Sequence, residues 1–152
     1  MTPRKIRAQI VLERVAWIRQ KLDAMGELPA GNLEEFEADE RNVAAMESYL
    51  RRTLEALLDI GRHLLAKGFG EGAIEYKQIA KGLRERGIVS PELSAVLVDM
   101  ARYRNRLTRF YDEVAPEELY TIMTTRIGDI ESVLEEILGW LRSNPELLDT
   151  SV

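Results

Sequence analysis

Cysteine is absent from this chain of 152 residues, and histidine occurs only once, at His63. Without cysteine the protein has no disulfide, no thiolate ligand for zinc and no cysteine nucleophile. A single histidine also excludes a zinc site made of several imidazoles, and we expect neither a metal nor another cofactor. Any acid–base chemistry must come from His63, from carboxylates or from tyrosine.

Long apolar runs are missing as well. No segment approaches the roughly 18–20 apolar residues that a membrane-spanning helix needs. The N-terminal segment, MTPRKIRAQIVLERVAWIRQ, carries charge throughout and contains no apolar stretch typical of a signal peptide. Together with the lack of cysteine, this predicts a cytoplasmic protein without membrane contact. The length fits one domain, which we place at residues 1–143, followed by a short C-terminal tail at residues 144–152.

The formal net charge is -5 at pH 7, so the molecule as a whole does not attract nucleic acid. Its cations are mostly arginine, with 16 arginines against 5 lysines. A guanidinium can hold a phosphate through two parallel hydrogen bonds, which an ammonium cannot do. Genomic base composition also explains such a skew, so a phosphate-binding site has to be argued from local clusters of arginine.

Apolar residues recur every three or four positions along most of the chain, which predicts helices and no β-strand of useful length. Ser90 and Pro91 are typical of the cap and first turn of a helix, and Gly87 is typical of a helix end. Five main helices are expected, at about residues 3–25, 39–67, 76–86, 91–111 and 116–143, with a short additional helix in LEEFEADE. The tail ELLDTSV is expected to fray.

Short connections between these segments predict an all-α bundle of about five helices. The glycine-rich segment KGFGEG is the one stretch that resembles a phosphate-binding loop. It lacks the GK[ST] ending and the preceding strand of such loops. We therefore interpret it as a turn between two helices.

The segment DMARYRNRLTRFYDE, at residues 99–113, carries the strongest functional signal. It contains four arginines, Arg102, Arg104, Arg106 and Arg109, interleaved with Tyr103, Phe110 and Tyr111. Guanidinium groups beside aromatic rings are typical of RNA binding, because the cations hold phosphates while the rings stack on bases. The competing interpretation is a solvated helix face whose arginines are balanced by Asp99, Asp112 and Glu113.

Helical spacing sets Arg104 apart from the other arginines. It stands in an apolar row with alternate spacings of four and three, formed by Leu93, Leu97, Met100, Arg104, Leu107, Tyr111 and Val114. A buried guanidinium is costly without a partner, so Arg104 requires a carboxylate, a phosphate or water. Arg104 and Tyr111 can therefore face one cleft or one subunit interface. The structural alternative is a salt bridge from Arg104 to a carboxylate such as Asp59 on the long helix.

The same segment resembles a known motif. Residues 104–111, RNRLTRFY, are similar to the motif of the HepT toxins: an arginine, a polar residue that is usually asparagine, a few further positions, then His-x-Tyr. The flanking segments also resemble that family, in the same order: ALLDIGRHLLAKG, YKQIAKGLRERGIVSPEL and PEELYTIMTTRIGDIESVLEEI. The similarity covers about residues 5–142, which is nearly the whole chain.

The resemblance implies a HEPN-type helical bundle that forms a homodimer, with a composite, metal-independent ribonuclease site between the two motif helices. It implies RNA as the substrate and a MntA-like nucleotidyltransferase antitoxin as the partner. Arg104 matches the catalytic arginine of the family, and Asn105 matches the polar residue after it. Tyr111 matches the tyrosine that the antitoxin of such a pair can adenylylate. Arg102 and Arg106 flank these positions and are expected to contact RNA.

One position departs from the family pattern, because Arg109 stands where the family has histidine. A guanidinium stays protonated and cannot take a proton from a ribose 2′-hydroxyl. Arg109 can instead stabilise the negative charge of a phosphorane or hold the RNA backbone. His63 lies in a row that looks like core, where a histidine is usually a packing residue. Tyr111 is the remaining candidate base, and the surrounding arginines would have to favour its anionic form.

Three hypotheses follow from these observations. In the first, the protein is an endoribonuclease toxin in which Arg104 and Arg109 stabilise phosphate charge and Asn105 positions the substrate. In the second, it is a degenerate HEPN protein that binds RNA or a nucleotidyltransferase partner without cleaving. In the third, it is a helical dimer with a purely structural role.

Overall fold

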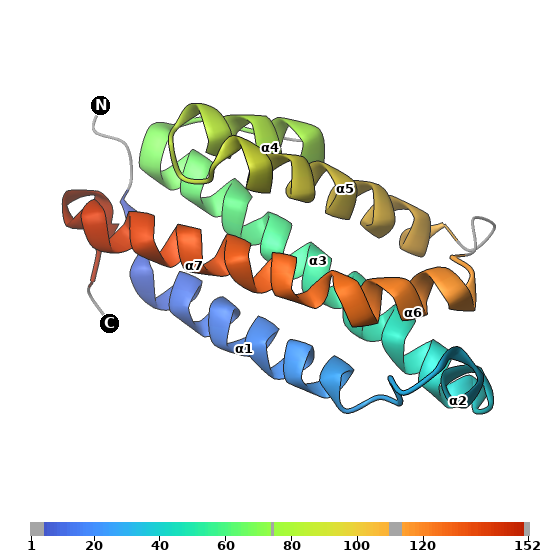
Figure 1. The fold of residues 1–152 in the computed structure, drawn as a ribbon. Helices are drawn as coiled ribbons and strands as arrows, with labels where there is room; N and C mark the ends of the chain where they lie inside the picture. The colour runs from blue at the N-terminus through green and yellow to red at the C-terminus, as the bar shows by residue number, and fades with distance from the viewer. Residues whose placement is uncertain (1–4, 74, 110–113, 151–152) are drawn as a thin grey trace.

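The computed structural model describes residues 5–73, 75–109 and 114–150. These residues form seven α-helices packed as a bundle (Figure 1): α1 (Ala8–Gly26), α2 (Leu33–Glu37), α3 (Glu40–Phe69), α4 (Tyr76–Glu85), α5 (Pro91–Thr108), α6 (Pro116–Thr125) and α7 (Ile127–Ser143). They also include a 3-10 helix, η1 (Pro145–Leu147), and two short strands, β1 (Ile6–Arg7) and β2 (Leu148–Asp149). The predicted all-α class is confirmed, with more helices than expected. No helix in this part of the chain is both long and apolar enough to cross a bilayer.

Helix α3 is long because an apolar stripe and good helix-forming residues run along it without interruption. Its fully buried side chains include Met46, Leu50, Leu54, Leu57 and Leu64. Asp39 caps the first turn by accepting a hydrogen bond of 2.9 Å from the backbone N–H of Arg41. Gly70 ends the helix in the left-handed conformation, with a φ of 66°.

The other helices take their places around α3. Helix α1 packs along one side of α3, whereas α4 and α5 pack together on the other side (Figure 1). Helix α7 lies between α1 and α5 at the front of the bundle in this view and contacts both. Because α3 separates α1 from α5, its two flanks face different neighbours.

The two ends of the described chain meet, contrary to the sequence-based expectation. Residues 6 and 7 were expected to belong to the first helix, yet β1 pairs in parallel with β2, with Ile6 opposite Leu148. The segment expected to fray therefore folds back through η1 and β2. A contact between residues so distant in the chain has no signature in the local periodicity of the sequence. Only the packing of the bundle brings the two strands together.

Two helix boundaries also differ from expectation. The helix predicted over residues 116–143 breaks at Arg126, which lies between α6 and α7 with a φ of -115°. The guanidinium of Arg126 binds Asp129 at 2.6 Å and Asp99 at 3.5 Å, so the break is tied to α5. Helix α5 was predicted to continue to about residue 111 or 112. It ends at Thr108, and Arg109 is already in an extended conformation.

Glycine lets α3 and α4 approach each other closely. A Cβ atom at Gly61 would lie only 2.6 Å from Cγ2 of Ile79. The same holds in reverse at Gly82, where a Cβ atom would lie 2.8 Å from Cδ1 of Leu65. This contact fixes α4, and with it Tyr76 at its first turn, close to α3.

Gly61→Ala is therefore expected to destabilise the fold, although alanine is the better helix former. Overpacking a core contact costs roughly 1–3 kcal/mol of unfolding free energy, and helix propensity returns about 1 kcal/mol at most. Gly139→Ala in α7 is the matched control, because its Cβ atom would meet only Nη2 of Arg142, at 3.9 Å. Urea denaturation should show a lower midpoint for Gly61→Ala and an equal or higher one for Gly139→Ala. A midpoint of Gly61→Ala at or above that of the wild type would contradict the close contact.

Candidate functional site

Arg104 lies where three helices meet. Its side chain is 25% exposed, as expected for a position in an otherwise apolar row of α5. Nη2 of Arg104 is 3.5 Å from Oε1 of Glu55 on α3. The guanidinium carbon of Arg104 lies 4.7 Å from the centre of the Tyr76 ring on α4. One carboxylate and one aromatic ring therefore contact the charge of Arg104.

The carboxylate that meets Arg104 is not the one suggested by the sequence. Asp59 was the suggested partner, but its Oδ1 binds Nη1 of Arg62 at 2.6 Å. Glu55, four residues earlier on α3, pairs with Arg104 instead. A change of one turn keeps the carboxylate on nearly the same flank of α3 and moves it by about 6 Å along the axis. Periodicity alone cannot distinguish two positions related in this way.

A chain of charged groups extends from this pairing. Nη1 of Arg51 is 3.9 Å from the same Oε1 of Glu55 that faces Arg104. A second guanidinium, that of Arg62, approaches Tyr76, with 5.5 Å between its carbon and the ring centre. Nε of Arg104 is buried and has no hydrogen-bond partner in the described part of the chain. Arg104 therefore keeps hydrogen-bonding capacity that Glu55 does not use.

An open pocket of about 390 Å³ lies beside this pairing. It is lined by Glu75, Tyr76, Lys77, Val98, Ala101, Arg102 and Asn105. Asn105 is exposed, and its Oδ1 accepts a hydrogen bond of 3.4 Å from Nη1 of Arg104. Arg102 is also exposed and lies 3.6 Å from Oδ1 of Asp99. Two of the predicted site residues, Arg102 and Asn105, therefore line the pocket, and Arg104 lies next to it through its contacts with Tyr76 and Asn105.

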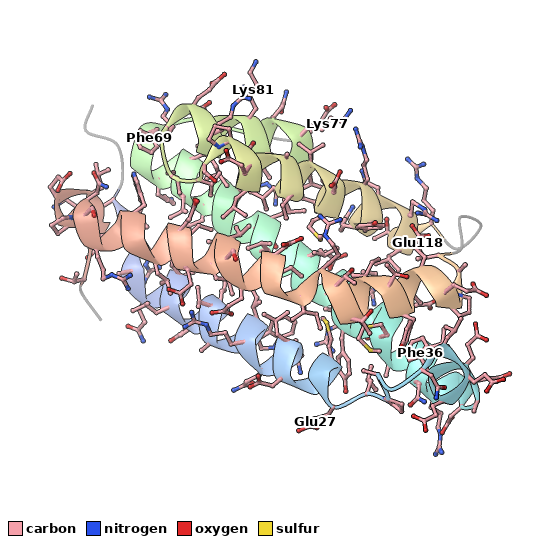
Figure 2. The ribbon with its side chains drawn as sticks, in the orientation of Figure 1. Glu27, Phe36, Phe69, Lys77, Lys81 and Glu118 are labelled. Carbon is pink, nitrogen blue, oxygen red and sulfur yellow. The ribbon has the colours of Figure 1, made fainter. Side chains whose placement is uncertain are left out.

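The remaining predicted residues are placed differently. Arg106 forms a bidentate pair with Glu118 of α6, which Figure 2 labels, at 2.7 and 2.9 Å. Arg109 is exposed directly after α5, and its backbone N–H donates to the carbonyl of Arg106 at 3.2 Å. Phe110 and Tyr111 lie outside the described residues, and Tyr111 is the predicted modification site.

Two residues of the site carried no signal in the sequence. Glu55 resembles any charged residue on the polar side of an amphipathic helix, and Tyr76 resembles the first residue of a short one. Both gain significance only because α3, α4 and α5 pack together. Across the described ranges, no three histidine, aspartate or glutamate side chains are grouped so as to hold a metal ion.

His63 lies just over two turns of α3 beyond Glu55, about 12 Å along the helix axis. Its Nε2 accepts a hydrogen bond of 3.1 Å from the backbone N–H of Arg7 in β1. Burial lowers the pKa of His63 below its ordinary 6.5, and the nearby cations Arg14, Lys67 and Arg7 lower it further. The ring is therefore neutral near pH 7 and has a structural partner away from the motif helix.

A family model matches most of the chain. It is described as Ribonuclease HepT-like, and the match spans residues 16–137. That range contains α3, α4 and α5, together with all the residues discussed around Arg104. No curated protein sequence matches the chain.

Several solved structures share this arrangement of helices. The cytosolic protein of unknown function YutE from Bacillus subtilis has a TM-score of 0.79 and 17% identity, over 97% of this chain and 98% of that chain. A tri-AMPylated HEPN toxin of Shewanella oneidensis in complex with MNT antitoxin has a TM-score of 0.78 and 19% identity, over 86% and 97%. A toxin–antitoxin structure with AMP-PNP has a TM-score of 0.78 and 18% identity, over 86% and 98%. At such identities the likeness shows a shared fold.

The lowered pKa of His63 predicts a loss of stability in mild acid. Below about pH 6.5 the unfolded chain protonates this histidine while the folded protein resists protonation, so proton binding favours unfolding. The urea midpoint of the wild type should therefore fall from about pH 7.5 to about pH 5.5. His63→Gln, whose amide oxygen can still accept from Arg7, should show a smaller fall. An equal fall in both proteins would contradict this role of His63.

Proposed function

We propose a function from the premise that this chain belongs to the Ribonuclease HepT-like family, whose model matches residues 16–137. The protein is the RNA-cleaving component of a toxin–antitoxin pair and works as a homodimer without a metal ion. The observation that supports this proposal is the pairing of Arg104 with Glu55 beside an open pocket. The pair supplies a cation for the phosphate and a carboxylate that can accept a proton, even though Arg109 replaces the histidine of the family motif.

Metal-independent cleavage of RNA needs a base and cations at one phosphodiester. The base removes the proton of the ribose 2′-hydroxyl, and the 2′-oxygen attacks the phosphorus. The bond from phosphorus to the 5′-oxygen then breaks, and that oxygen takes a proton from water. The products are a 2′,3′-cyclic phosphate and a 5′-hydroxyl end. Cations stabilise the additional negative charge that the phosphorane carries between these steps.

Glu55 is the base in this scheme. Its side chain is 33% exposed, so a ribose hydroxyl can reach the carboxylate from solvent. Arg104 and Arg51 both approach its Oε1, and both guanidiniums can turn toward a phosphate that binds beside it. The negative phosphate then opposes the stabilisation that these cations give to the carboxylate, which makes Glu55 a better proton acceptor.

The other motif residues hold the substrate. Arg104 and Arg109 bind the oxygens of the reacting phosphate, and Asn105 positions the nucleotide through its exposed amide. Arg102 contacts a neighbouring phosphate from the edge of the pocket. Arg106 reaches the RNA backbone only after leaving its bidentate partner on α6, so its contribution to binding is the smallest of these residues.

A second subunit and an antitoxin complete the proposed system. In a homodimer, two copies of α5 facing each other would place two sets of arginines around one RNA strand. A MntA-like nucleotidyltransferase would silence the protein by adenylylating Tyr111. The similar toxin structures were solved with antitoxins, and one of them is AMPylated, which supports this partnership.

Binding without cleavage is the second candidate function. The only histidine of the chain, His63, is engaged by the backbone of Arg7 and lies away from the motif helix. This observation favours a protein that has lost the imidazole chemistry of its family and retains binding of RNA or of the nucleotidyltransferase.

Incubation of purified, antitoxin-free protein with labelled tRNA and mRNA in EDTA tests both candidates. The wild type is expected to release fragments with 2′,3′-cyclic phosphate ends. Arg104→Ala and Glu55→Gln should each slow cleavage by about a hundredfold or more, because they remove the phosphate cation or the base. Glu85→Gln is the matched control for losing one carboxylate, since Glu85 is exposed on α4. Circular dichroism and melting curves establish that each variant is folded.

The pH dependence and Arg109→His separate the two candidates. With Glu55 as the base, the wild-type rate lacks the inflection at about pH 6.5 that an imidazole base produces, and Arg109→His introduces one. Wild-type cleavage that is unchanged in Glu55→Gln would remove Glu55 from the mechanism. No cleavage by the wild type, together with cleavage by Arg109→His, would establish the binding-only candidate.

Co-expression with the cognate nucleotidyltransferase is expected to attach AMP to Tyr111. Intact-mass analysis should show one or more added AMP units, and peptide sequencing should place them at Tyr111. Tyr111→Phe should abolish the modification, whereas Tyr103→Phe, in the same segment, should retain it. An unmodified Tyr111 beside a nucleotidyltransferase that is active on other substrates would count against this regulation.

A further inference from the structure

Cations gather along the outer junction of α1 and α3, on the side of α3 away from α5. Figure 1 shows α1 and α3 running side by side, with α4 and α5 across α3 from α1. We call this surface the α1/α3 face, and its cations are Arg7, Arg14, Lys21, Arg52 and Lys67. The chain as a whole carries a net charge of -5, so a band of positive charge is a local exception.

Helical spacing aligns these cations. Arg14 and Lys21 are seven residues apart, which is close to two helical turns, so they lie along one side of α1, and Arg7 precedes that helix in β1. Arg52 and Lys67 lie fifteen residues apart on α3, slightly more than four turns. Positive charge therefore comes from both helices along the length of their junction.

Aromatic rings contact the cations in the middle of the α1/α3 face. Nζ of Lys21 lies 5.2 Å from the centre of the Trp17 ring and 6.0 Å from that of Tyr49. The guanidinium carbon of Arg52, from α3, lies 5.4 Å from the same Trp17 ring. Contacts between cations and ring faces restrict the long side chains. Two cations from two helices are thus held close together before any ligand binds.

The end of the band lies around His63. Burial lowers the pKa of this imidazole, and the nearby cations Arg14, Lys67 and Arg7 lower it further. Two of these cations come from the N-terminal segment and one comes from α3. The cations near His63 are thus Arg7 in β1, Arg14 on α1 and Lys67 on α3, and Arg14 lies one turn of α1 before Trp17.

The cations of the α1/α3 face lack the acidic partners that other cations of the same helices have. Among the described residues, none of the four on α1 and α3 forms a salt bridge with a carboxylate. On the opposite flank of α1, Arg19 binds Glu131 and Glu135 at 2.7 Å each. The neighbouring acid Glu13 accepts a hydrogen bond from Gln9 at 3.0 Å. Asp149 stands opposite Arg7 in the strand pair, so the other four cations, which have no ion-paired carboxylate among the described residues, contribute most to the attraction of a polyanion.

We propose that the α1/α3 face binds the phosphate backbone of single-stranded RNA, as a second contact remote from Arg104. Phosphates that bind there release counterions, and each such contact adds affinity without reading sequence. The inference relies on the proposed function only for the choice of RNA as the polyanion and requires no cleavage. A long RNA would bind this face on the side of α3 opposite the pocket. The RNA could then remain bound while one of its phosphodiesters is at Arg104.

The composition of this face favours RNA over a protein partner. Stable protein interfaces have an apolar centre with few charges, whereas nucleic-acid interfaces are strongly positive. Leu12 is the large apolar side chain most exposed in the described chain, at 55%. Leu12 is not one of the residues around Trp17 and Arg52. The side chains described on this face are the five cations and the Trp17 and Tyr49 rings that Lys21 and Arg52 contact.

The experiment measures binding of a fluorescein-labelled oligouridine by anisotropy over a range of salt concentrations. Arg14→Gln/Arg52→Gln removes two cations of the face without adding negative charge. Each phosphate contact contributes about 0.7 to the slope of log affinity against log salt for single strands. The double variant should therefore bind several-fold more weakly, with a slope that is lower by roughly 1.4.

Lys81→Gln/Arg84→Gln is the matched control, because it makes the same change in net charge. Both residues are exposed on α4, across α3 from α1, and Figure 2 labels Lys81 there. This variant should keep the affinity and the salt slope of the wild type. Trp140→Phe leaves Trp17 as the only tryptophan, since the chain has two. RNA should then change the emission of Trp17, and Arg14→Gln/Arg52→Gln should remove that change.

Three results would overturn the inference. Equal losses in the two double variants would mean a general effect of net charge. A wild type that binds no oligouridine even at low salt would exclude an RNA contact at the α1/α3 face. The cleavage and adenylylation experiments would still test the proposed function separately. Loss of nucleotidyltransferase binding with unchanged RNA binding in Arg14→Gln/Arg52→Gln would make this face a protein-docking surface.

Discussion

Burial of one apolar stripe of α3 is the constraint on which the rest of the structure depends. The stripe is covered by α1 on one side and by α4 and α5 on the other. The partners of the residues that border this stripe depend on which helix lies beside them. On one flank this brings Glu55 against Arg104. On the other flank it brings Arg52 against Trp17. The two polar regions of the molecule are thus consequences of the same packing.

Arg104 occupies a position where charge is costly. Removing an ion from water costs several kcal/mol, roughly, and one carboxylate at 3.5 Å with one ring face offsets only part of that cost. An ion pair of this kind is weak evidence for stability, because apolar side chains of similar volume often stabilise a fold equally well or better. The proposed function gives the pair a role in binding a phosphate. A guanidinium that has already lost part of its water binds an incoming phosphate more strongly than a fully solvated one does.

Local rules account for most of the helix boundaries. Ser90 caps α5 as the sequence indicated, with its Oγ accepting a hydrogen bond of 3.2 Å from the backbone N–H of Leu93. Boundaries that depend on distant partners were missed. The helix break at Arg126 involves Asp99 on α5, and the strand at Ile6 requires β2 near the other end of the chain. Sequence patterns report short-range periodicity, whereas these features are set by contacts that form only in the folded bundle.

The sequence by itself determined that the protein is a helical bundle and that one arginine in an apolar row needs a partner. Both are properties of spacing along a single helix. Only the tertiary structure decided that this partner is Glu55 and not Asp59, because a shift of one turn between α3 and α5 leaves every periodicity unchanged. It also decided that Lys21 and Arg52, from helices far apart in the chain, share the Trp17 ring. Spacing within a helix is local, whereas the register between helices follows from how their side chains interlock.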